Sequence, residues 1–391
     1  MKMVECMKYL STSNINNKRV ILRCDFNVPI KNGVIIDDSK ITKSLNTIKY
    51  LLNNNNKVII LSHFGRVKNE EDKLNNSLYL VYEYLKNIIN IEFISNPLNL
   101  EMVNNSSSNC FLVENTRFTD IPEKTESANS IELAKYWSSY GDVFVIDAFA
   151  SLHRAHASTA GISKYLSTYL GFLVEEELNN LQPLINIQSR PFVVIMGGAK
   201  VDDKIKIIEN IINKCDKLIL TGGILNTFLK VAGKNIGNSL ASNEEEVILS
   251  VKNVLDNYRN KIYFTDNFIV KREGLNKNIK ISEILDGDII CDNIPNLSSI
   301  LKSAQIIFMN GTCGKYEEDD YQKGTIKLFR DLQNNSNVYL GGGDTISAVN
   351  KFKMSDRYKY LSSGGGATLE YVATGKLKAL EWIEKNSVDN I

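Results

Sequence analysis

The chain has 391 residues, which exceeds the length over which one hydrophobic core keeps growing, so two domains are expected. Lys and Arg total 46 against 45 Asp and Glu, and this balance excludes a global field that would hold the chain on nucleic acid or an anionic membrane. Any anion site must therefore be local.

The N-terminal stretch of the sequence, MKMVECMKYLSTSNINNKRV, lacks the apolar core of a signal peptide, and nowhere do 18 apolar residues run together. The six cysteines are scattered, without a CxxC pair or a Cys/His cluster at metal-ligand spacing. We therefore expect a cytoplasmic protein with reduced cysteines and no membrane or nucleic-acid partner.

Short apolar runs in the first half of the chain end in polar residues, at the points where the chain should turn from a strand into the next segment. We call these strand ends corners. The runs are RVILRCDFN (19–27), KVIILSH (57–63), CFLVEN (110–115) and DVFVIDAF (142–149). Helical patterns lie between them, such as ITKSLNTIKYLLNN (41–54), with apolar residues three and four apart. Strands that alternate with helices indicate right-handed crossovers and a parallel sheet.

The same alternation returns in the second half, but its strands end in glycines. The runs are PFVVIMGG (191–198), KLILTGG (217–223), QIIFMNG (305–311) and NVYLGGGD (337–344). Ligands of open α/β sheets bind outside the carboxyl ends of the strands, so the two halves should hold different ligands. We predict an α/β protein with two doubly wound domains, 1–168 and 188–371, joined by an amphipathic, acidic helix within 169–187.

The corners of the first half gather positive charge. The chain has only three histidines, His63, His153 and His156, and each lies beside an arginine after a strand. With Arg23, Arg66, Arg117 and Arg154, four arginines follow four strands. A single such residue is usually structural, but four at equivalent corners favour a site for carboxylate and phosphate, which the planar guanidinium binds bidentately. Asp25 and Asn27 could accept a hydroxyl proton of the ligand or could serve only as turn or cap residues.

The glycine corners favour a nucleotide. GGAKVDDK (197–204) follows a strand and is predicted to open a helix, with Lys200 and Lys204 one turn apart on the same face. Glycines let backbone N–H groups approach phosphate, and a helix N-terminus adds favourable polarity. No P-loop motif occurs, and one glycine pair alone is more often a tight turn. Four such corners, at 197, 222, 341 and 364, make phosphate binding the better interpretation.

Two acidic residues complete the predicted nucleotide side. Asp344 in GGGDT is a candidate contact for Mg²⁺, which is usually held by one or two carboxylates plus phosphates. Its alternative role is a helix N-cap. Glu317 could accept the ribose hydroxyls or could simply be solvated.

An ordered set of motifs resembles the phosphoglycerate kinase family over about residues 18–376. The motifs are RCDFNVP, SHFGR, VENTRF, DAFASLHRAHAS, GGAKVDDKI, TGGILNTFLK, MNGTCGKYE, KGT, GGGDT and SSGGGATLE. The resemblance implies reversible phosphoryl transfer from 1,3-bisphosphoglycerate to ADP with Mg²⁺, a hinge between the domains, and a monomer. It also implies that the segment from about 372 to 391 packs back on the first domain.

The resemblance assigns roles residue by residue. The phosphoglycerate side would comprise Arg23, Asp25, Phe26, Asn27, His63, Gly65, Arg66, Arg117, His153, Arg154 and His156. The nucleotide side would comprise Gly198, Ala199, Lys200, Lys204, Gly222, Gly223, Asn310, Glu317, Gly342, Gly343, Asp344 and Thr345, with Asp344 also on the metal. Lys40, Lys200 and Lys204 would act in catalysis, and Gly364, Gly365 and Gly366 would form a loop at the transition state.

The chain departs from the family pattern at Lys40, where the family places a catalytic arginine. Lysine keeps the charge but loses the planar fork. On the nucleotide side, TGG (221–223) is one glycine short, Ile294 replaces a glycine, and MNGTCGKYE lacks the usual Trp and Pro.

Three functions are compatible with these residues. The first is an active phosphoglycerate kinase, in which an ionised carboxylate accepts the phosphoryl group and no general base is needed. The second is a non-catalytic protein that binds phosphoglycerate and nucleotide, and the third is a kinase for another small acid or nucleotide. Retention of Lys200, Lys204 and Asp344 favours a catalyst.

Overall fold

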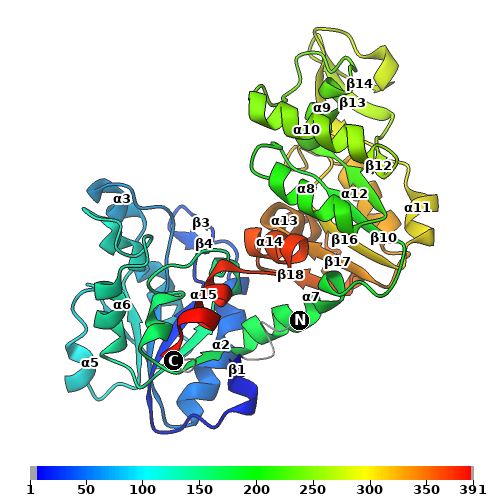
Figure 1. Cartoon of the computed structure of the whole chain (residues 1–391). Helices are drawn as coiled ribbons and strands as arrows, with labels where there is room; N and C mark the ends of the chain where they lie inside the picture. The colour runs from blue at the N-terminus through cyan, green and yellow to red at the C-terminus, as the bar shows by residue number, and fades with distance from the viewer. Residues whose placement is uncertain (1–6, 389–391) are drawn as a thin grey trace. The chain divides into compact units, whose positions relative to one another are not determined.

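The computed structural model describes residues 7–388. By its internal contacts the chain divides into two compact units (Figure 1). The N-terminal unit comprises the chain up to Asn179 together with the segment from Lys376 onward, and the C-terminal unit comprises Asn180–Gly375. Each unit is a parallel sheet flanked by helices, which confirms the predicted α/β class.

The N-terminal unit is built on a seven-stranded sheet in the order β1-β9-β8-β2-β5-β7-β6, with every neighbouring pair parallel. Its strands are β1 (Lys8–Tyr9), β2 (Arg19–Cys24), β5 (Lys57–Leu61), β6 (Glu92–Ile94), β7 (Cys110–Val113), β8 (Val143–Asp147) and β9 (Thr168–Leu170). The chain leaves β2 toward β5 and later returns to β8 on the other side of β2. This reversal creates a crevice at the carboxyl ends of β2 and β8, where ligands of such sheets bind.

Helices and short turns cover this sheet. The helices are α2 (Ser39–Asn53), α3 (Glu70–Asn75), α4 (Tyr79–Lys86), α5 (Met102–Asn105), α6 (Ile131–Ser138) and α15 (Lys378–Asn386). The 3₁₀ turns are η1 (Leu10–Thr12), η2 (Thr116–Asp120), η3 (Phe149–Ser151) and η4 (Gly161–Lys164), and β3 (Ile30–Lys31) pairs with β4 (Val34–Ile35) as a hairpin.

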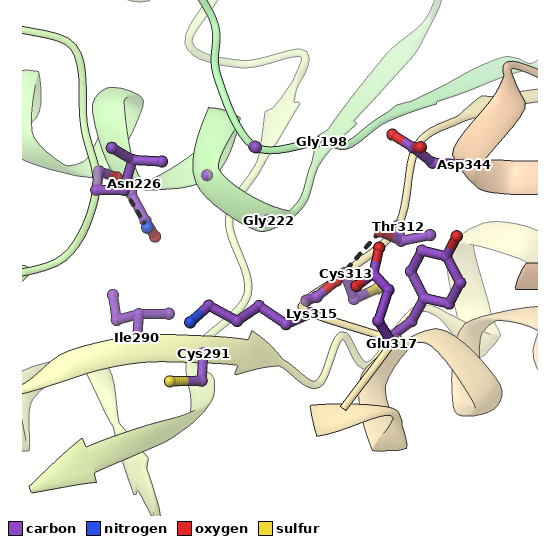
Figure 2. A pocket seen from close by; sticks show the side chains of 15 residues that line it. Gly198, Gly222, Asn226, Ile290, Cys291, Thr312, Cys313, Lys315, Glu317 and Asp344 are labelled. Atoms are coloured by element: carbon purple, nitrogen blue, oxygen red, sulfur yellow. Dashed lines mark hydrogen bonds between the residues drawn. The ribbon is translucent and has the colours of Figure 1, made fainter. Parts of the chain in front are cut away.

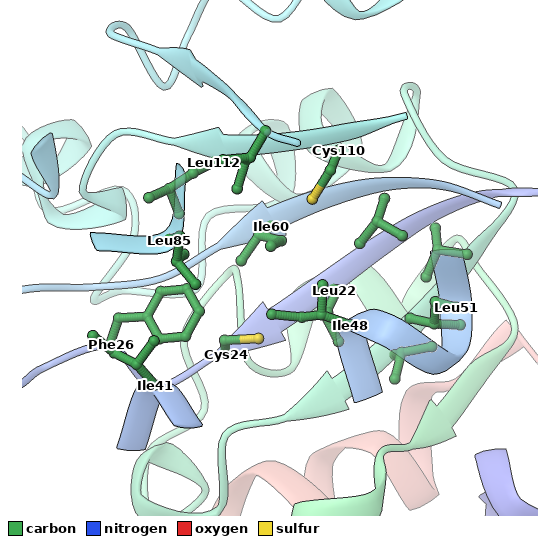
Figure 3. Packing of buried hydrophobic residues seen from close by; sticks show 14 of the residues in the cluster. Leu22, Cys24, Phe26, Ile41, Ile48, Leu51, Ile60, Leu85, Cys110 and Leu112 are labelled. Atoms are coloured by element: carbon green, nitrogen blue, oxygen red, sulfur yellow. The ribbon is translucent and has the colours of Figure 1, made fainter. Parts of the chain in front are cut away.

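The periodicity of α2 explains its place in the core. Its buried residues recur at three and four positions, so one face packs on the sheet while the other carries lysines. Figure 3 shows this packing, with α2 residues against strand residues from β2, β5 and β7: Ile41, Ile48 and Leu51 against Leu22, Ile60 and Leu112.

The C-terminal unit contains a six-stranded parallel sheet in the order β12-β11-β10-β16-β17-β18. Its strands are β10 (Phe192–Met196), β11 (Lys217–Leu220), β12 (Ile262–Tyr263), β16 (Ile306–Asn310), β17 (Val338–Gly341) and β18 (Tyr360–Ser362). Its helices are α8 (Ile205–Lys214), α9 (Gly222–Val231), α10 (Glu245–Tyr258), α11 (Ser298–Ser303), α12 (Lys323–Leu332), α13 (Gly343–Lys351) and α14 (Gly366–Thr374). The 3₁₀ turns are η5 (Ile281–Glu283), η6 (Asp319–Tyr321) and η7 (Ser355–Arg357).

A small antiparallel sheet that the sequence analysis did not predict also belongs to this unit. It consists of β13 (Asn267–Arg272), β14 (Leu275–Lys280) and β15 (Ile289–Asn293), in the order β14-β13-β15. Its strand β15 supplies wall residues of the cavity described below.

The predicted linking helix is present but begins later than residue 169. Residues Thr168–Leu170 form β9, and α7 runs from Phe172 to Ile185. The start is set by Asp147, whose carboxylate accepts the N–H groups of Leu173 and Val174 and so caps the first turn. The division between the units falls inside this helix, after Asn179.

Among the described residues, no helix has both the length and the apolar character needed to cross a membrane. The five cysteines of this part of the chain are all buried and unpaired, and Cys6 lies outside it.

Candidate active site

The structure gathers the predicted basic residues at one edge of the N-terminal sheet. Because β8, β2, β5 and β7 are parallel neighbours, the segments that follow them lie at the same edge. These segments carry Arg23, Asp25 and Asn27 after or at the end of β2; His63, Gly65 and Arg66 after β5; Arg117 in η2 after β7; and His153, Arg154 and His156 after β8. We call this set the basic edge.

Asp25 is the acidic centre of the basic edge. Its Oδ2 accepts a hydrogen bond from Lys40 Nζ at 2.9 Å, and its Oδ1 accepts the N–H of Asn27 at 3.1 Å. Burial alone would raise the pKa of Asp25, but the neighbouring positive charge of Lys40 lowers it to about 2. The carboxylate is therefore ionised at neutral pH and already paired with the residue that replaces the family's arginine.

Two residues predicted to bind the ligand are placed differently by the structure. Arg23 is only 1% exposed, and its guanidinium donates to Ser158 Oγ, to the carbonyl of Cys24 and to His63 Nδ1. Phe26 packs its ring in the core, because the alternation after β2 turns it inward. Both side chains are buried, so any contribution of Arg23 runs through the neighbours that it contacts.

The three histidines are neutral at physiological pH. Burial, and then the charge of Arg23, holds the pKa of His63 well below its usual value. Burial and neighbouring arginines lower the pKa of His156 to about 3, and burial followed by Arg154 lowers that of His153. The positive charge of the basic edge therefore comes from its arginines, and Lys40 of α2 adds a further cation beside Asp25.

The arginines differ in their freedom to bind an anion. Arg66 and Arg154 are exposed, whereas Arg117 is half-buried and donates to the carbonyl of Gly65. Gly65 in turn donates its N–H to Asn27 Oδ1 at 3.0 Å, which ties the loops after β2 and β5 together.

Asn115 is a structural residue of this edge that the sequence analysis did not single out. Its amide bonds the N–H and carbonyl of Phe64, the carbonyl of Asn76 and the N–H of Arg117. It thereby joins the loop after β5 to the turn that carries Arg117. The sequence signal that could have identified Asn115 is its position inside the motif VENTRF.

On the C-terminal unit, four helices begin at the carboxyl edge of the sheet. α8, α9, α13 and α14 start soon after β10, β11, β17 and β18. The N-terminus of a helix carries positive polarity, which suits phosphate.

The predicted placement of the two lysines on one helical face is wrong. Residues 197–204 form a loop, and α8 begins only at Ile205. The loop turns tightly because the carbonyl of the buried Val201 accepts the N–H groups of both Lys204 and Ile205. Lys200 is exposed, while Lys204 Nζ donates to Gly197 O at 2.8 Å and Asn310 Oδ1 at 3.0 Å. Burial lowers the pKa of Lys204.

The glycine corners serve two different purposes. A Cβ on Gly223 would lie 1.9 Å from Ala199 O, so this glycine lets two loops touch. A Cβ on Gly343, Gly365 or Gly366 would meet nothing within 4 Å. The first kind is required by packing of the chain against itself, whereas the second leaves open space at the starts of α13 and α14.

A cavity of about 180 Å³ lies beside these corners (Figure 2). Of the predicted nucleotide residues, it is lined by Gly198, Ala199, Gly222, Gly223, Glu317 and Asp344. Wall residues that the sequence analysis missed include Asn226, Leu240, Ile290, Cys291, Thr312 and Lys315. Figure 2 shows Asp344 and Glu317 at one end of the cavity and Asn226 and Ile290 at the other. Ile290 and Cys291 come from the unpredicted strand β15.

Asp344 and Thr345 have distinct surroundings within the first turn of α13. Gly342, rather than Asp344, occupies the N-cap position, so the Asp344 carboxylate is exposed and lines the cavity. The buried Thr345 accepts the N–H of Gly311 at its hydroxyl, 2.7 Å away, and so holds the loop after β16.

The donor set fits a magnesium ion that is bound mainly by phosphates. In the described residues, no three His, Cys, Asp or Glu side chains come together as a metal site. One hard carboxylate at a phosphate-binding corner is nevertheless the usual protein contribution to Mg²⁺. Asp344 is the residue here that could supply it.

An edge rich in arginine on one α/β unit and a glycine-cornered cavity on the other define the class of two-domain small-molecule kinases. The comparisons with known proteins specify the family. The family model described as phosphoglycerate kinase matches residues 10–376. The chain therefore belongs to the phosphoglycerate kinase family and is an enzyme.

Individual relatives cover nearly the whole chain. It is 40% identical to the phosphoglycerate kinase of Mycoplasma genitalium, over 97% of this chain and 99% of that protein. It is 39% identical to that of Fusobacterium nucleatum, over 96% and 99%. Among solved structures, phosphoglycerate kinase from Coxiella burnetii matches with a TM-score of 0.82 and 33% identity, over 97% of this chain and 98% of that one. These names support the catalytic function rather than the non-catalytic alternative.

Proposed function

We propose that this chain reversibly transfers a phosphoryl group from 1,3-bisphosphoglycerate to ADP, yielding 3-phosphoglycerate and ATP. The observation that carries the proposal is the match to the phosphoglycerate kinase family over residues 10–376. The basic edge of the N-terminal unit and the glycine corners of the C-terminal unit agree with two anionic substrates.

The basic edge would hold the phosphoglycerate. Arg66 and Arg154 are exposed and carry the planar fork that matches phosphate and carboxylate oxygens. Arg117 and the neutral imidazoles of His63, His153 and His156 would add hydrogen bonds, and Asn27 would contact a hydroxyl group. Arg23 would position His63, and the backbone of Gly65 would position Arg117 and Asn27 through hydrogen bonds.

The corners of the C-terminal unit would hold the nucleotide. The open space at Gly343, Gly365 and Gly366 allows phosphate oxygens to approach the starts of α13 and α14. Glu317 lines the cavity and would accept ribose hydroxyls, while Lys200 and Lys204 would accompany the transferring group. Asn310 and Thr345 would act by holding Lys204 and Gly311 in place.

Bound Mg²⁺, held by Asp344 and the nucleotide phosphates, would supply neutralisation of the phosphate charge. The acceptor in the direction of ATP consumption is an ionised carboxylate, so no side chain has to remove a proton. The protein's task is positioning, charge neutralisation and exclusion of water. Since the two substrates bind on separate units, transfer would require a hinge at α7.

Lys40 would take the catalytic place of the family's arginine. In the structure its ammonium lies 2.9 Å from Asp25 Oδ2. To assist transfer, it would release this carboxylate and turn to the phosphoryl group, while Asp25 turns to a substrate hydroxyl.

We expect the protein to act as a cytoplasmic monomer in glycolysis or gluconeogenesis.

A coupled assay tests the function. Purified protein should form ATP from ADP only when both 1,3-bisphosphoglycerate and Mg²⁺ are present. Chelation of Mg²⁺ should stop the reaction, and its readdition should restore it. Turnover no faster than a buffer control would refute the proposal, and faster turnover with another small acid or nucleotide would redirect it.

A further inference from the structure

A buried carboxylate that no step above uses lies under the basic edge. Glu126 is 0% exposed and belongs to the loop between η2 and α6. Its Oε2 accepts the N–H of Ser158 at 3.0 Å, and its Oε1 accepts the hydroxyls of Ser158 and, at 3.3 Å, of Thr116. Thr116 directly precedes Arg117, and Ser158 follows His156 by two residues. Glu126 therefore joins two segments of the basic edge.

Ser158 extends this contact to the buried Arg23. Arg23 Nε donates to Ser158 Oγ at 2.9 Å, and that hydroxyl donates onward to Glu126 Oε1. A guanidinium that is 1% exposed needs compensating negative charge, because the loss of hydration of a buried cation is costly. Burial lowers the pKa of Arg23, and Glu126 and Asp25 act against that shift.

Arg23 in turn determines which nitrogen of His63 carries the proton. Its Nη2 lies 3.0 Å from His63 Nδ1. A guanidinium can only donate hydrogen bonds, so Nδ1 must accept, and a neutral imidazole then carries its proton on Nε2. His63 has one donor left, and that donor is available to a ligand.

We propose that Glu126 is a positioning residue for the reaction: acting through Ser158 and Arg23, it holds His63 as the Nε2–H tautomer that donates to the phosphorylated acid. The inference rests on the proposed function, because it assumes that the acid binds at the basic edge. The chain of contacts Glu126, Ser158, Arg23, His63 contains no group that binds the ligand until its last member.

The test replaces the carboxylate by an amide of the same shape. In Glu126→Gln, the KM for 3-phosphoglycerate should rise by about 10- to 100-fold, the size of effect seen when hydrogen-bond partners that orient metal ligands are replaced. The kcat and the KM for ATP should change by less than about twofold. The matched control is Glu123→Gln, an exposed carboxylate in the same loop, which should behave as the unmodified enzyme.

A second variant breaks the same chain without removing charge. Ser158→Ala should raise the same KM, and the double variant should be little worse than the single ones, since both interrupt one path. Additive effects would contradict a shared path. Thermal unfolding of each variant identifies any that fail to fold, and the other variant then carries the test.

The tautomer provides a readout that a general packing defect would not move. With three histidines in the chain, ¹⁵N-labelled imidazoles can be distinguished by NMR. His63 should show the Nε2–H tautomer in the unmodified protein and a mixture in Glu126→Gln. An unchanged tautomer together with an unchanged KM would overturn the inference.

The proposed function is tested separately in the same experiment. If the unmodified protein turns over and Arg154→Ala raises the KM for 3-phosphoglycerate while Glu126→Gln does not, the inference fails and the function stands. If the unmodified protein shows no turnover at all, the function itself fails.

Discussion

Each unit carries its candidate site residues at the carboxyl edge of its own parallel sheet, but the two edges are built in different ways. The N-terminal unit uses long charged side chains and must compensate them internally, with Asp25 against Lys40 and Glu126 near Arg23. The C-terminal unit uses backbone, and its glycines let loops approach one another, as at Gly223 and Ala199.

The difference explains which substitutions each unit tolerates. A side-chain site fails when a charge loses its partner, because a buried unpaired charge is costly. A backbone site fails when a Cβ separates two loops that must touch, even if no charge changes. Four predictions, including that for Glu126 above, test the distinction.

The largest effect is expected at Lys40, for which we propose a catalytic role in addition to its pairing with Asp25. Lys40→Ala should lower kcat/KM by on the order of 10³-fold, because a cation on the transferring phosphoryl group can be worth that much. Lys40→Arg keeps the charge and should leave the rate similar or higher. The coupled assay measures both, and an unaffected Lys40→Ala enzyme would show that another residue has the role.

In the C-terminal unit, substitution of a glycine needed for packing should have a different effect from substitution of a glycine that borders open space. Gly223→Ala puts a Cβ 1.9 Å from Ala199 O and should cost about 2–3 kcal/mol of unfolding free energy. Gly343→Ala meets nothing within 4 Å and should stabilise α13 by up to about 1 kcal/mol. If phosphate approaches Gly343 closely, the same variant should raise the KM for nucleotide.

Urea unfolding and nucleotide kinetics on the two glycine variants separate these effects. Equal stability of both variants would mean that the two kinds of corner do not differ. A stabilised Gly343→Ala enzyme with unchanged nucleotide KM would place the phosphates elsewhere.

The last prediction concerns the acid sensitivity of the Asp25–Lys40 pair. The folded pKa of Asp25 is lowered from 3.8 to about 2, so the pair stabilises the fold fully above about pH 4 and loses that contribution as the pH falls toward 2. The loss should amount to about 2 kcal/mol. The unfolding free energies of the unmodified protein and of Asp25→Asn should be measured by urea unfolding between pH 2 and 6. Between pH 4 and 2 the unfolding free energy should fall more steeply with pH in the unmodified protein than in the variant. Parallel pH dependences would contradict the lowered pKa of Asp25.

Much of the fold could be predicted because its strands are short apolar runs bounded by polar or glycine corners. The principal central strands, β2, β5, β8, β10, β16 and β17, fall within predicted runs. The sheet β13–β15 was missed because its outer strand β14 is almost wholly exposed and carries no apolar alternation. The cavity walls at Ile290 and Cys291 were missed with it.

The candidate site divides in the same way. Arginines, histidines and glycines after strands were recognisable, because parallel strands bring such corners to one edge. The sequence alone could not reveal Glu126, whose partners Thr116 and Ser158 lie 10 and 32 residues away. The helical spacing assumed for Lys200 and Lys204 was wrong, since the buried Val201 turns that segment into a loop.

Residue types and their order along the chain thus determined by themselves the α/β class, the family resemblance and the separation of a basic half from a glycine half. Only the tertiary structure decided which basic residues are exposed, which glycines are needed for packing, and which carboxylates compensate the arginines. Periodicity is a local property that sequence records, whereas burial and charge pairing depend on segments far apart in the chain. Arg23 illustrates this: the family resemblance placed it on the phosphoglycerate side, and only the structure shows that it is buried and contacts His63.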